Sequence, residues 1–243
     1  MKNTLNVIQK LTRSKVSRYF IPWFAGYYQV DLSALGAPVA SFLHLEAFFT
    51  RRLKAGARPF DPSTDGLVSP VDGFLSIVSD VSADSKFVVK GKTYRLLDLL
   101  KRRDLVEHYI GGQVLVFYLS PSDYHRIHMP LHARETEHYR LGRWSWPVND
   151  WGLRYTKALT GNYRLVSQFQ SGNLPFCLVC VGALNVNSIV RRHEQNTVYQ
   201  KMAEYGHFSF GSTVVLILPK GRFRLENSTA RPVRAGESLG TIQ

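Results

Sequence analysis

The chain has 243 residues, of which 44% are hydrophobic and 12% aromatic, which is enough for a packed core and argues against a disordered protein. Its formal net charge of +13 favours an acidic partner: nucleic acid, an anionic membrane surface or an anionic substrate. The basic residues form short clusters such as Arg51-Arg52, without the interleaved aromatic residues typical of nucleic-acid stacking surfaces. We therefore expect a membrane or lipid partner and no nucleic acid.

The sequence lacks the signs of a secreted scaffold and of a membrane-spanning helix. Its two cysteines, Cys177 and Cys180, are too few for a disulfide framework. The apolar residues after Met1 are interrupted by Lys10 and Arg13, unlike those of a signal peptide. No stretch approaches the roughly 18 uninterrupted apolar residues that a spanning helix needs. The sequence predicts a protein that is cytosolic or bound to the inner face of a membrane.

Residues 4–30 have the pattern of an amphipathic helix. Apolar and aromatic residues recur at spacings of three and four with lysines and arginines between them, and Pro22 breaks or kinks the segment. A basic helix with aromatic residues on its other face is typical of a helix that lies in a membrane interface. The alternative is a helix that packs these aromatic side chains against the rest of the protein, and the pattern leaves both open.

A second amphipathic helix is predicted over residues 39–54, with apolar residues at helical spacing and basic residues at its C-terminal end. The stretch 58–66, rich in proline, aspartate and serine, then predicts a loop. We place a boundary there, between an N-terminal helical, membrane-associating segment, residues 1–60, and a β-rich body, residues 61–243.

Beyond residue 66 the pattern becomes that of strands. Apolar runs predict buried strands at 113–119, 176–184 and 213–218. Residues 133–175 predict short strands at most, in a stretch rich in loops. The chain as a whole predicts an α+β fold, with N-terminal amphipathic helices on a mainly antiparallel β-sheet or barrel-like body.

Three stretches carry polar side chains among apolar neighbours. Asp72 lies in a Pro-x-Asp-Gly turn, His125 and His128 follow an apolar strand, and Ser212 follows Gly211 at the start of another. A serine, an aspartate and histidines from distant segments are the components of an activated nucleophile. Each also has a structural explanation by itself, since Asp-Gly is common in turns and a glycine before a strand hydroxyl often marks a bulge.

Other kinds of site have weaker support. Further histidines near His125 and His128 suggest zinc, but no His-Glu-x-x-His or comparable spacing supplies a third ligand, and we expect no metal. Cys177 and Cys180 lie three apart in an apolar strand, where they point to opposite faces, so the pattern predicts core residues and not a redox or zinc motif. No Gly-x-Ser-x-Gly elbow is present, which argues against an α/β-hydrolase.

Together these motifs resemble those of the phosphatidylserine decarboxylases, the pyruvoyl enzymes of bacterial and mitochondrial membranes. The resemblance covers essentially the whole chain, and its most specific block is Tyr-Leu-Ser-Pro-x-Asp-Tyr-His-Arg-x-His-Met-Pro at 118–130. Ser-Pro-x-Asp-Gly at 69–73 is similar to the family's aspartate motif, and Phe-Gly-Ser-Thr-Val at 210–214 stands where the family has its self-cleavage motif. The stretch between Ile189 and Gly211 is short for the family, which leaves the substrate pocket and the choice of head group open.

The resemblance implies a proenzyme that cuts itself between Gly211 and Ser212. The Ser212 hydroxyl would attack the Gly211 carbonyl, with His128 as the base and Asp72 orienting it, and the former serine would become a pyruvoyl group at position 212. This covalent group would be the cofactor, and it would accept the electrons left when carbon dioxide departs from the substrate. His125 would either donate a proton to the product or position the substrate, and both roles stay open.

The same resemblance implies phosphatidylserine as the substrate, phosphatidylethanolamine and carbon dioxide as products, and a place in phospholipid biosynthesis. The fragments 1–211 and 212–243 would form a heterodimer, with a homodimer also suggested by the family, peripheral to the cell membrane on its cytoplasmic side. Three alternatives remain: a decarboxylase of another lipid head group or amino acid, an uncleaved relative that only binds phospholipid, and a non-catalytic lipid-binding barrel. The last is suggested by the tail at 233–240, which resembles turns of biotinyl- and lipoyl-type barrels.

Overall fold

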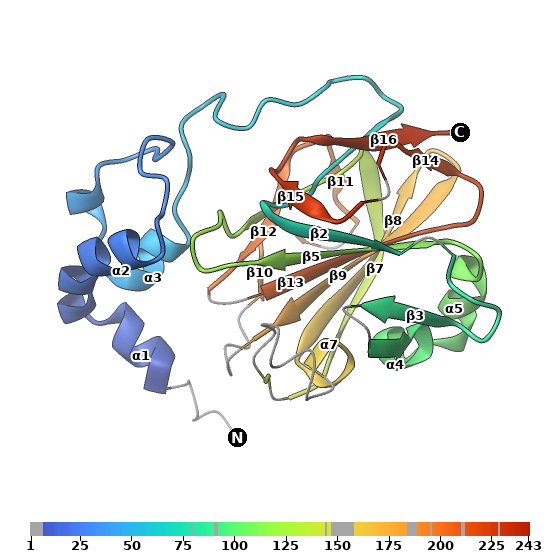
Figure 1. Cartoon of the computed structure of the whole chain (residues 1–243), viewed down its shortest axis with the longest axis horizontal. Helices are drawn as coiled ribbons and strands as arrows, with labels where there is room; N and C mark the ends of the chain where they lie inside the picture. The colour runs from blue at the N-terminus through green and yellow to red at the C-terminus, as the bar shows by residue number, and fades with distance from the viewer. Residues whose placement is uncertain are drawn as a thin grey trace.

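The structure, a computed structural model, describes residues 7–78, 80–89, 92–143, 145–146, 158–183, 189–194, 196–209, 212–227 and 229–243. Phe210 and Gly211 of the predicted cleavage motif lie outside these ranges. The described chain forms a group of N-terminal helices beside a β body (Figure 1). Each described strand pairing is antiparallel. The predicted α+β fold, with N-terminal helices on a mainly antiparallel body, is confirmed.

Short helices joined by turns form the N-terminal segment. They are α1 (Val7–Arg13), η1 (Lys15–Phe20), α2 (Ile21–Tyr27), η2 (Val39–Ser41) and α3 (Leu45–Phe49). Pro22 lies in the first turn of α2, where its missing N–H breaks no helical hydrogen bond. Phe24, Phe48 and Phe49 pack in a small core of their own, with the ring of Phe24 edge-on to the other two.

The helix predicted over 39–54 is wrong in length, because only Leu45–Phe49 is α-helical there. After Thr50 the chain pairs with an earlier segment instead of continuing the helix. Gly36 donates its N–H to the carbonyl of Arg52, and Leu35 and Leu53 form an antiparallel bridge. This tertiary pairing outweighs the helical periodicity of the sequence.

The body is built on an eight-stranded sheet in the order β11-β7-β8-β9-β13-β5-β2-β15. Its strands are β2 (Gly73–Val78), β5 (Gln113–Leu119), β7 (Ala133–Leu141), β8 (Arg164–Ser171), β9 (Leu174–Gly182), β11 (Val198–Tyr199), β13 (Ser212–Leu218) and β15 (Arg231–Val233). Strand β13 lies in the interior of this sheet, bonded to β9 on one side and β5 on the other. The strands predicted at 113–119, 176–184 and 213–218 therefore become the centre of the sheet.

Both faces of the large sheet are covered. On one face lie two three-stranded sheets, made of β1 (Gly66–Val68), β16 (Ser238–Ile242) and β14 (Phe223–Leu225), and of β10 (Ile189–Arg191), β12 (Glu204–Phe208) and β6 (Arg126–His128). On the other lie the hairpin of β3 (Lys86–Val89) and β4 (Lys92–Arg95) and the helices α4 (Leu96–Leu100), α5 (Arg103–Tyr109) and α7 (Ala158–Gly161). Each face thus has its own hydrophobic core.

Alternation along the central strands divides their side chains between the two cores. Val214 and Cys180 lie in the first core, and Val215 and Cys177 in the second. The two cysteines are fully buried, unpaired thiols on opposite faces, as predicted. Burial raises the pKa of both thiols, which keeps them in the protonated, unreactive form.

The prediction of short strands at most between 133 and 175 is wrong, since β7 and β8 have nine and eight residues. The reason is a buried charge: Glu135 on β7 has no exposed surface and pairs with Arg191 on β10. An ion pair can be buried when both partners are satisfied, and it then interrupts the apolar alternation by which a strand is detected.

The Asp-Gly turn before β2 requires its glycine. Gly73 has a φ of +155°, and a Cβ at this position would lie 2.5 Å from the carbonyl oxygen of Tyr118 on β5. Strands β2 and β5 can therefore approach each other only when residue 73 lacks a side chain. This approach places the preceding residue, Asp72, at the end of β5.

We expect Gly73→Ala to destabilise the protein by on the order of 2–4 kcal/mol, because the methyl group would collide with backbone that cannot move independently. Gly172→Ala is the matched control: Gly172 also has a positive φ, +55°, but open space around its Cβ position. We expect the control to cost about 1 kcal/mol. Unfolding in guanidinium measures both, and equal losses would contradict the role given to the close approach.

Candidate active site

The ends of four strands meet at the same end of the large sheet. Strand β13 begins at Ser212, which lies between Leu119 at the end of β5 and Gly182 at the end of β9. Strand β2 begins on the other side of β5, and Asp72 immediately precedes it. The loop after β5 leads to the two histidines. The segments singled out in the sequence therefore gather at the same end of the sheet.

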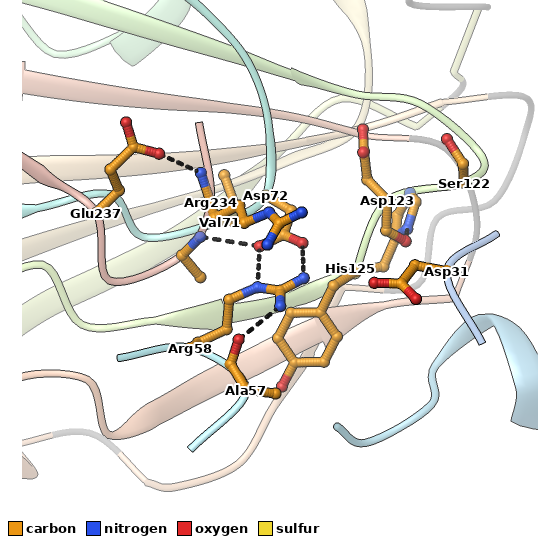
Figure 2. A network of polar contacts seen from close by, with 12 residues as sticks. Asp31, Ala57, Arg58, Val71, Asp72, Ser122, Asp123, His125, Arg234 and Glu237 are labelled. Carbon is orange, nitrogen blue, oxygen red and sulfur yellow. Dashed lines mark hydrogen bonds and ion pairs between the residues drawn. The ribbon is translucent and has the colours of Figure 1, made fainter. Parts of the chain in front are cut away.

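Asp72 is held firmly by neighbours on two segments. Its Oδ1 accepts hydrogen bonds from Nε of Arg58 at 2.8 Å and from the backbone N–H of Ala235 at 2.8 Å. Its Oδ2 pairs with Nη2 of the same arginine, which completes a two-pronged ion pair (Figure 2). The side chain is buried, with 9% of its surface exposed, and these contacts fix the direction of its carboxyl group.

His125 is fully buried and presents one bare nitrogen. Its Nδ1 lies 2.9 Å from the carbonyl oxygen of Asp123, and because a carbonyl only accepts, Nδ1 carries the hydrogen. The Nε2 lone pair has no partner in the described structure, and the ring packs 4.0 Å from that of Phe49. Burial lowers the pKa of His125 to about 3, and the charge of Arg51 acts in the same direction.

His128, like His125, carries its hydrogen on Nδ1, but its neighbours are different. Its Nδ1 donates to the carbonyl of Met202 at 2.8 Å, and its Nε2 lies 3.1 Å from the Tyr124 hydroxyl. Strand alternation places Ile127 in the core under the large sheet and His128 on the side of the N-terminal segment. Burial lowers the pKa of His128, while the Met202 carbonyl and the charge of Asp72 act in the opposite direction.

Ser212 is completely buried, and its hydroxyl has no hydrogen-bond partner among the described residues. A buried hydroxyl without a partner is costly and uncommon, and the adjacent Thr213 hydroxyl is in the same state. Strand alternation places Ser212 on the same face as Val214, toward the core that also contains β6 and β12. Its neighbour on β9 is Gly182, which leaves that side free of a side chain.

These residues do not form a bonded relay in the described structure. Asp72 is bonded to Arg58 and Ala235, and His128 to Met202 and Tyr124, so the two interact through charge and not through a shared hydrogen bond. His125 and Ser212 are both buried, and Nε2 of the one and Oγ of the other have no hydrogen-bond partner among the described residues.

A cavity of about 360 Å³ opens between the N-terminal segment and the body beside Asp72. Figure 2 shows Asp123 on the loop after β5 and Arg58 below Asp72, which line this cavity, together with His125, which follows Tyr124 in the chain and is not part of the lining. No role was predicted for Arg51, Arg58 and Tyr124, which line this cavity. The contacts of the two arginines are made with residues distant in the sequence, which no local pattern reveals.

The described residues contain no group of three His, Cys, Asp or Glu side chains suited to a metal ion. They also include no helix with both the length and the apolar character needed to cross a membrane.

Comparison with known proteins gives full-length matches. A family model described as phosphatidylserine decarboxylase matches residues 45–241. The phosphatidylserine decarboxylase proenzyme of Halalkalibacterium halodurans is 40% identical over 238 residues, which cover 97% of this chain and 92% of that protein. The proenzyme of Bacillus thuringiensis is 39% identical over 241 residues, which cover 98% of this chain and 92% of that protein. The proenzyme of Anoxybacillus flavithermus is 39% identical over 242 residues, which cover 98% of this chain and 91% of that protein.

The fold and these matches define a carboxy-lyase that is made as a proenzyme. The chain belongs to the phosphatidylserine decarboxylase family, as its motifs predicted. The cofactor of these proenzymes is a pyruvoyl group derived from a serine. Ser212 fits that requirement, because its unpartnered hydroxyl is not needed for structure and the group would occupy the place of the residue itself.

The Arg58–Asp72 pair gives a prediction about stability. Arg58→Met leaves a buried carboxylate without its counter-charge and should cost on the order of 3 kcal/mol. Asp72→Asn in the same chain removes that charge while keeping an acceptor for Ala235, so the double variant should recover most of the loss. Denaturant unfolding of the single and double variants tests this, and additive losses would show that the pair is not coupled.

The buried His125 gives a prediction about pH. Its pKa is about 3 when folded and roughly 6.5 when unfolded. Between these values the unfolded chain binds a proton that the folded chain does not. The free energy of unfolding is therefore highest above about pH 6.5 and decreases as the pH falls. Replacing His125 with Gln should reduce the loss of unfolding free energy between pH 7 and 5 by at most about 2 kcal/mol. An unchanged pH slope in urea titrations would contradict a buried neutral imidazole.

Proposed function

We propose that the chain cuts itself between Gly211 and Ser212 and then, with residue 212 as its pyruvoyl cofactor, decarboxylates phosphatidylserine to phosphatidylethanolamine. The observation that carries this proposal is the fully buried, unpartnered hydroxyl of Ser212 at the start of a central strand. Asp72 and both histidines lie on the segments that meet at the same end of the sheet.

In the cleavage step the Ser212 Oγ attacks the carbonyl carbon of Gly211. The amide C–N bond breaks as an ester C–O bond forms, and loss of the Cα proton of residue 212 then eliminates the chain that ends at Gly211 as a carboxylate. Water hydrolyses the dehydroalanine left at position 212 with loss of ammonia, which gives the pyruvoyl ketone.

Nε2 of His128 accepts the hydroxyl proton, since Met202 holds the hydrogen on Nδ1. Because His128 lies on the side of the N-terminal segment and Ser212 faces the core, the ring must first leave the Tyr124 hydroxyl and turn toward Ser212. The charges of Glu204 and Asp72 then favour the protonated ring.

In the decarboxylation step the pyruvoyl group supplies an electron sink for the carbon that loses carbon dioxide. His125 is suited to carry a proton, because its Nε2 is bare and its Nδ1–H is fixed on the Asp123 carbonyl. Because burial keeps the ring neutral at the start, His125 can protonate the substrate carbon only with a proton that it receives within the site. The ring of Phe49 excludes water from one side.

The two fragments remain together in this proposal. After a cut before residue 212, β13 is still bonded to β5 and β9, β15 to β2, and β16 to β1. Each strand of the 212–243 fragment named here thus has a partner in the 1–211 fragment. Such a heterodimer separates only on unfolding.

The N-terminal segment, residues 1–60, is proposed to hold the enzyme on an anionic membrane surface at the cytoplasmic side of the cell membrane. It carries many of the exposed large hydrophobic side chains: Leu11, Val16, Tyr19, Phe20, Trp23, Tyr27, Leu32 and Leu43. Residues 1–30 contain lysines and arginines but no aspartate or glutamate. An exposed apolar surface with basic neighbours favours an interface with anionic lipid.

Self-cleavage is tested by mass spectrometry of freshly made protein under denaturing conditions. We expect one fragment that ends at Gly211 and another that begins at position 212 with a blocked N-terminus. Ser212→Ala and His128→Ala should both remain as one 243-residue chain. His125→Ala should be cleaved normally but decarboxylate at least about 100-fold more slowly, the usual contribution of a general acid or base.

The two histidine variants distinguish the roles that we assign. Cleavage in His128→Ala, or its loss in His125→Ala, would transfer the role of base to His125. A wild-type chain that stays intact would overturn self-processing altogether.

Membrane binding is tested by flotation with vesicles of anionic and of zwitterionic lipid. We expect Trp23→Ala to weaken binding to anionic vesicles several-fold, because it removes an exposed ring from the basic segment. Trp146→Ala is the matched control, since Trp146 on the body is 59% exposed against 61% for Trp23. Equal effects of the two variants would place the membrane contact elsewhere.

A further inference from the structure

Arg51 is a buried cation with unused hydrogen-bonding capacity. The residue is 4% exposed, and its Nη2 donates to the carbonyls of Ser122 and Asp123 at 2.6 and 3.0 Å. Its Nε and Nη1 are buried and have no partner in the described structure. Such groups are rare in folded proteins, because each unpaired donor removed from water costs free energy.

The carboxylates nearby do not neutralise Arg51. Asp72 acts on it electrostatically but is already paired with Arg58, and Oδ2 of Asp123 accepts the backbone N–H of Ser120 at 2.6 Å. Within the described residues no acidic group lies within ion-pair distance of Arg51. Burial lowers the pKa of Arg51, and the charges of Asp72 and Asp123 act in the opposite direction without forming an ion pair with it.

The guanidinium lies at the boundary between the cavity and His125. Arg51 lines the 360 Å³ cavity and packs over the ring of Phe48, with its central carbon 5.4 Å from the ring centre. It shares the Asp123 carbonyl with the His125 ring, which donates to the same oxygen at 2.9 Å. An anion bound by Arg51 would therefore lie in the cavity and close to the proposed proton carrier.

A phosphodiester fits this position better than a carboxylate. A carboxylate that leaves as carbon dioxide loses its charge during the reaction, so a strong ion pair with it would stabilise the substrate more than the transition state. A phosphodiester keeps its charge throughout, and its binding can position the reacting end without that penalty. The free Nη1 donor of the guanidinium can reach one phosphate oxygen, while Nε–H points to the side of Nη2, which the two backbone carbonyls already occupy.

We propose that Arg51 binds the phosphodiester of the lipid head group through its free Nη1 donor. The inference rests on the proposed function for the identity of the lipid, and it adds the residue that recognises the head group. The ring face of Phe48 and the backbone carbonyls of Ser122 and Asp123 hold the Arg51 guanidinium in place, so its direction does not depend on the ligand.

The experiment compares Arg51→Gln with Arg52→Gln, which removes the same charge from a neighbouring side chain that is 63% exposed. With phosphatidylserine in mixed micelles, we expect Arg51→Gln to raise KM at least about 10-fold and to change kcat less, as for loss of a charge-assisted contact. Arg52→Gln should stay within about twofold of wild type. Self-cleavage and the melting temperature report whether each variant folds.

Direct binding separates this inference from the proposed function. Calorimetric titration with glycerophosphoethanolamine, which has a phosphodiester but no carboxylate, should give binding to wild type that is weakened at least about 10-fold in Arg51→Gln. Arg51→Lys should be intermediate, and it replaces Arg51→Gln if that variant does not fold. Equal binding by wild type and variant, or loss of binding only for free serine, would overturn the proposal. Absence of decarboxylation with normal Arg51-dependent binding would instead overturn the proposed function.

Discussion

The hydrogen bonding of β13 to β9 on one side and to β5 on the other is the constraint on which the site depends. It fixes Ser212 between the ends of two strands and buries it completely. It also places the serine one strand away from the turn that holds Asp72. Because β13 contributes to both hydrophobic cores, this position cannot shift without disturbing the whole body. A reactive group on such a strand is held more rigidly than one on a loop.

The parts of the fold that the sequence predicted are those where apolar periodicity agrees with the final contacts. Strand β5 was predicted with its observed bounds, and the opposite orientation of Cys177 and Cys180 followed from the period of a strand. The failures have a common cause, which is that a distant contact overrides the local pattern. Glu135 is buried only because Arg191 arrives from β10, and the helix near Thr50 ends because the next residues pair with an earlier segment.

The residues proposed to react were singled out from the sequence, and their roles stay predictions, whereas the residues that support them were not singled out. Ser212 and His125 are conspicuous in sequence because a polar residue beside an apolar strand is unusual. Arg58 and Arg51 are not conspicuous, since arginines near a helix end are common on surfaces. Their importance comes from partners 14 and 71 residues away, which no local pattern contains. The N-terminal segment therefore contributes directly to the site, in addition to its exposed apolar surface.

The complete burial of Ser212 has a consequence for the chemistry of the chain end. Ordinary proteolysis before this residue would create an α-amino group, which is largely protonated at neutral pH because its usual pKa is roughly 7.7–8. That ammonium would lie inside the central strand with no described acidic side chain bonded to this position, and an isolated buried charge is strongly unfavourable. A keto acyl end at position 212 carries no charge. Removing the nitrogen thus makes the cut compatible with the fold, independently of what the ketone does for the substrate.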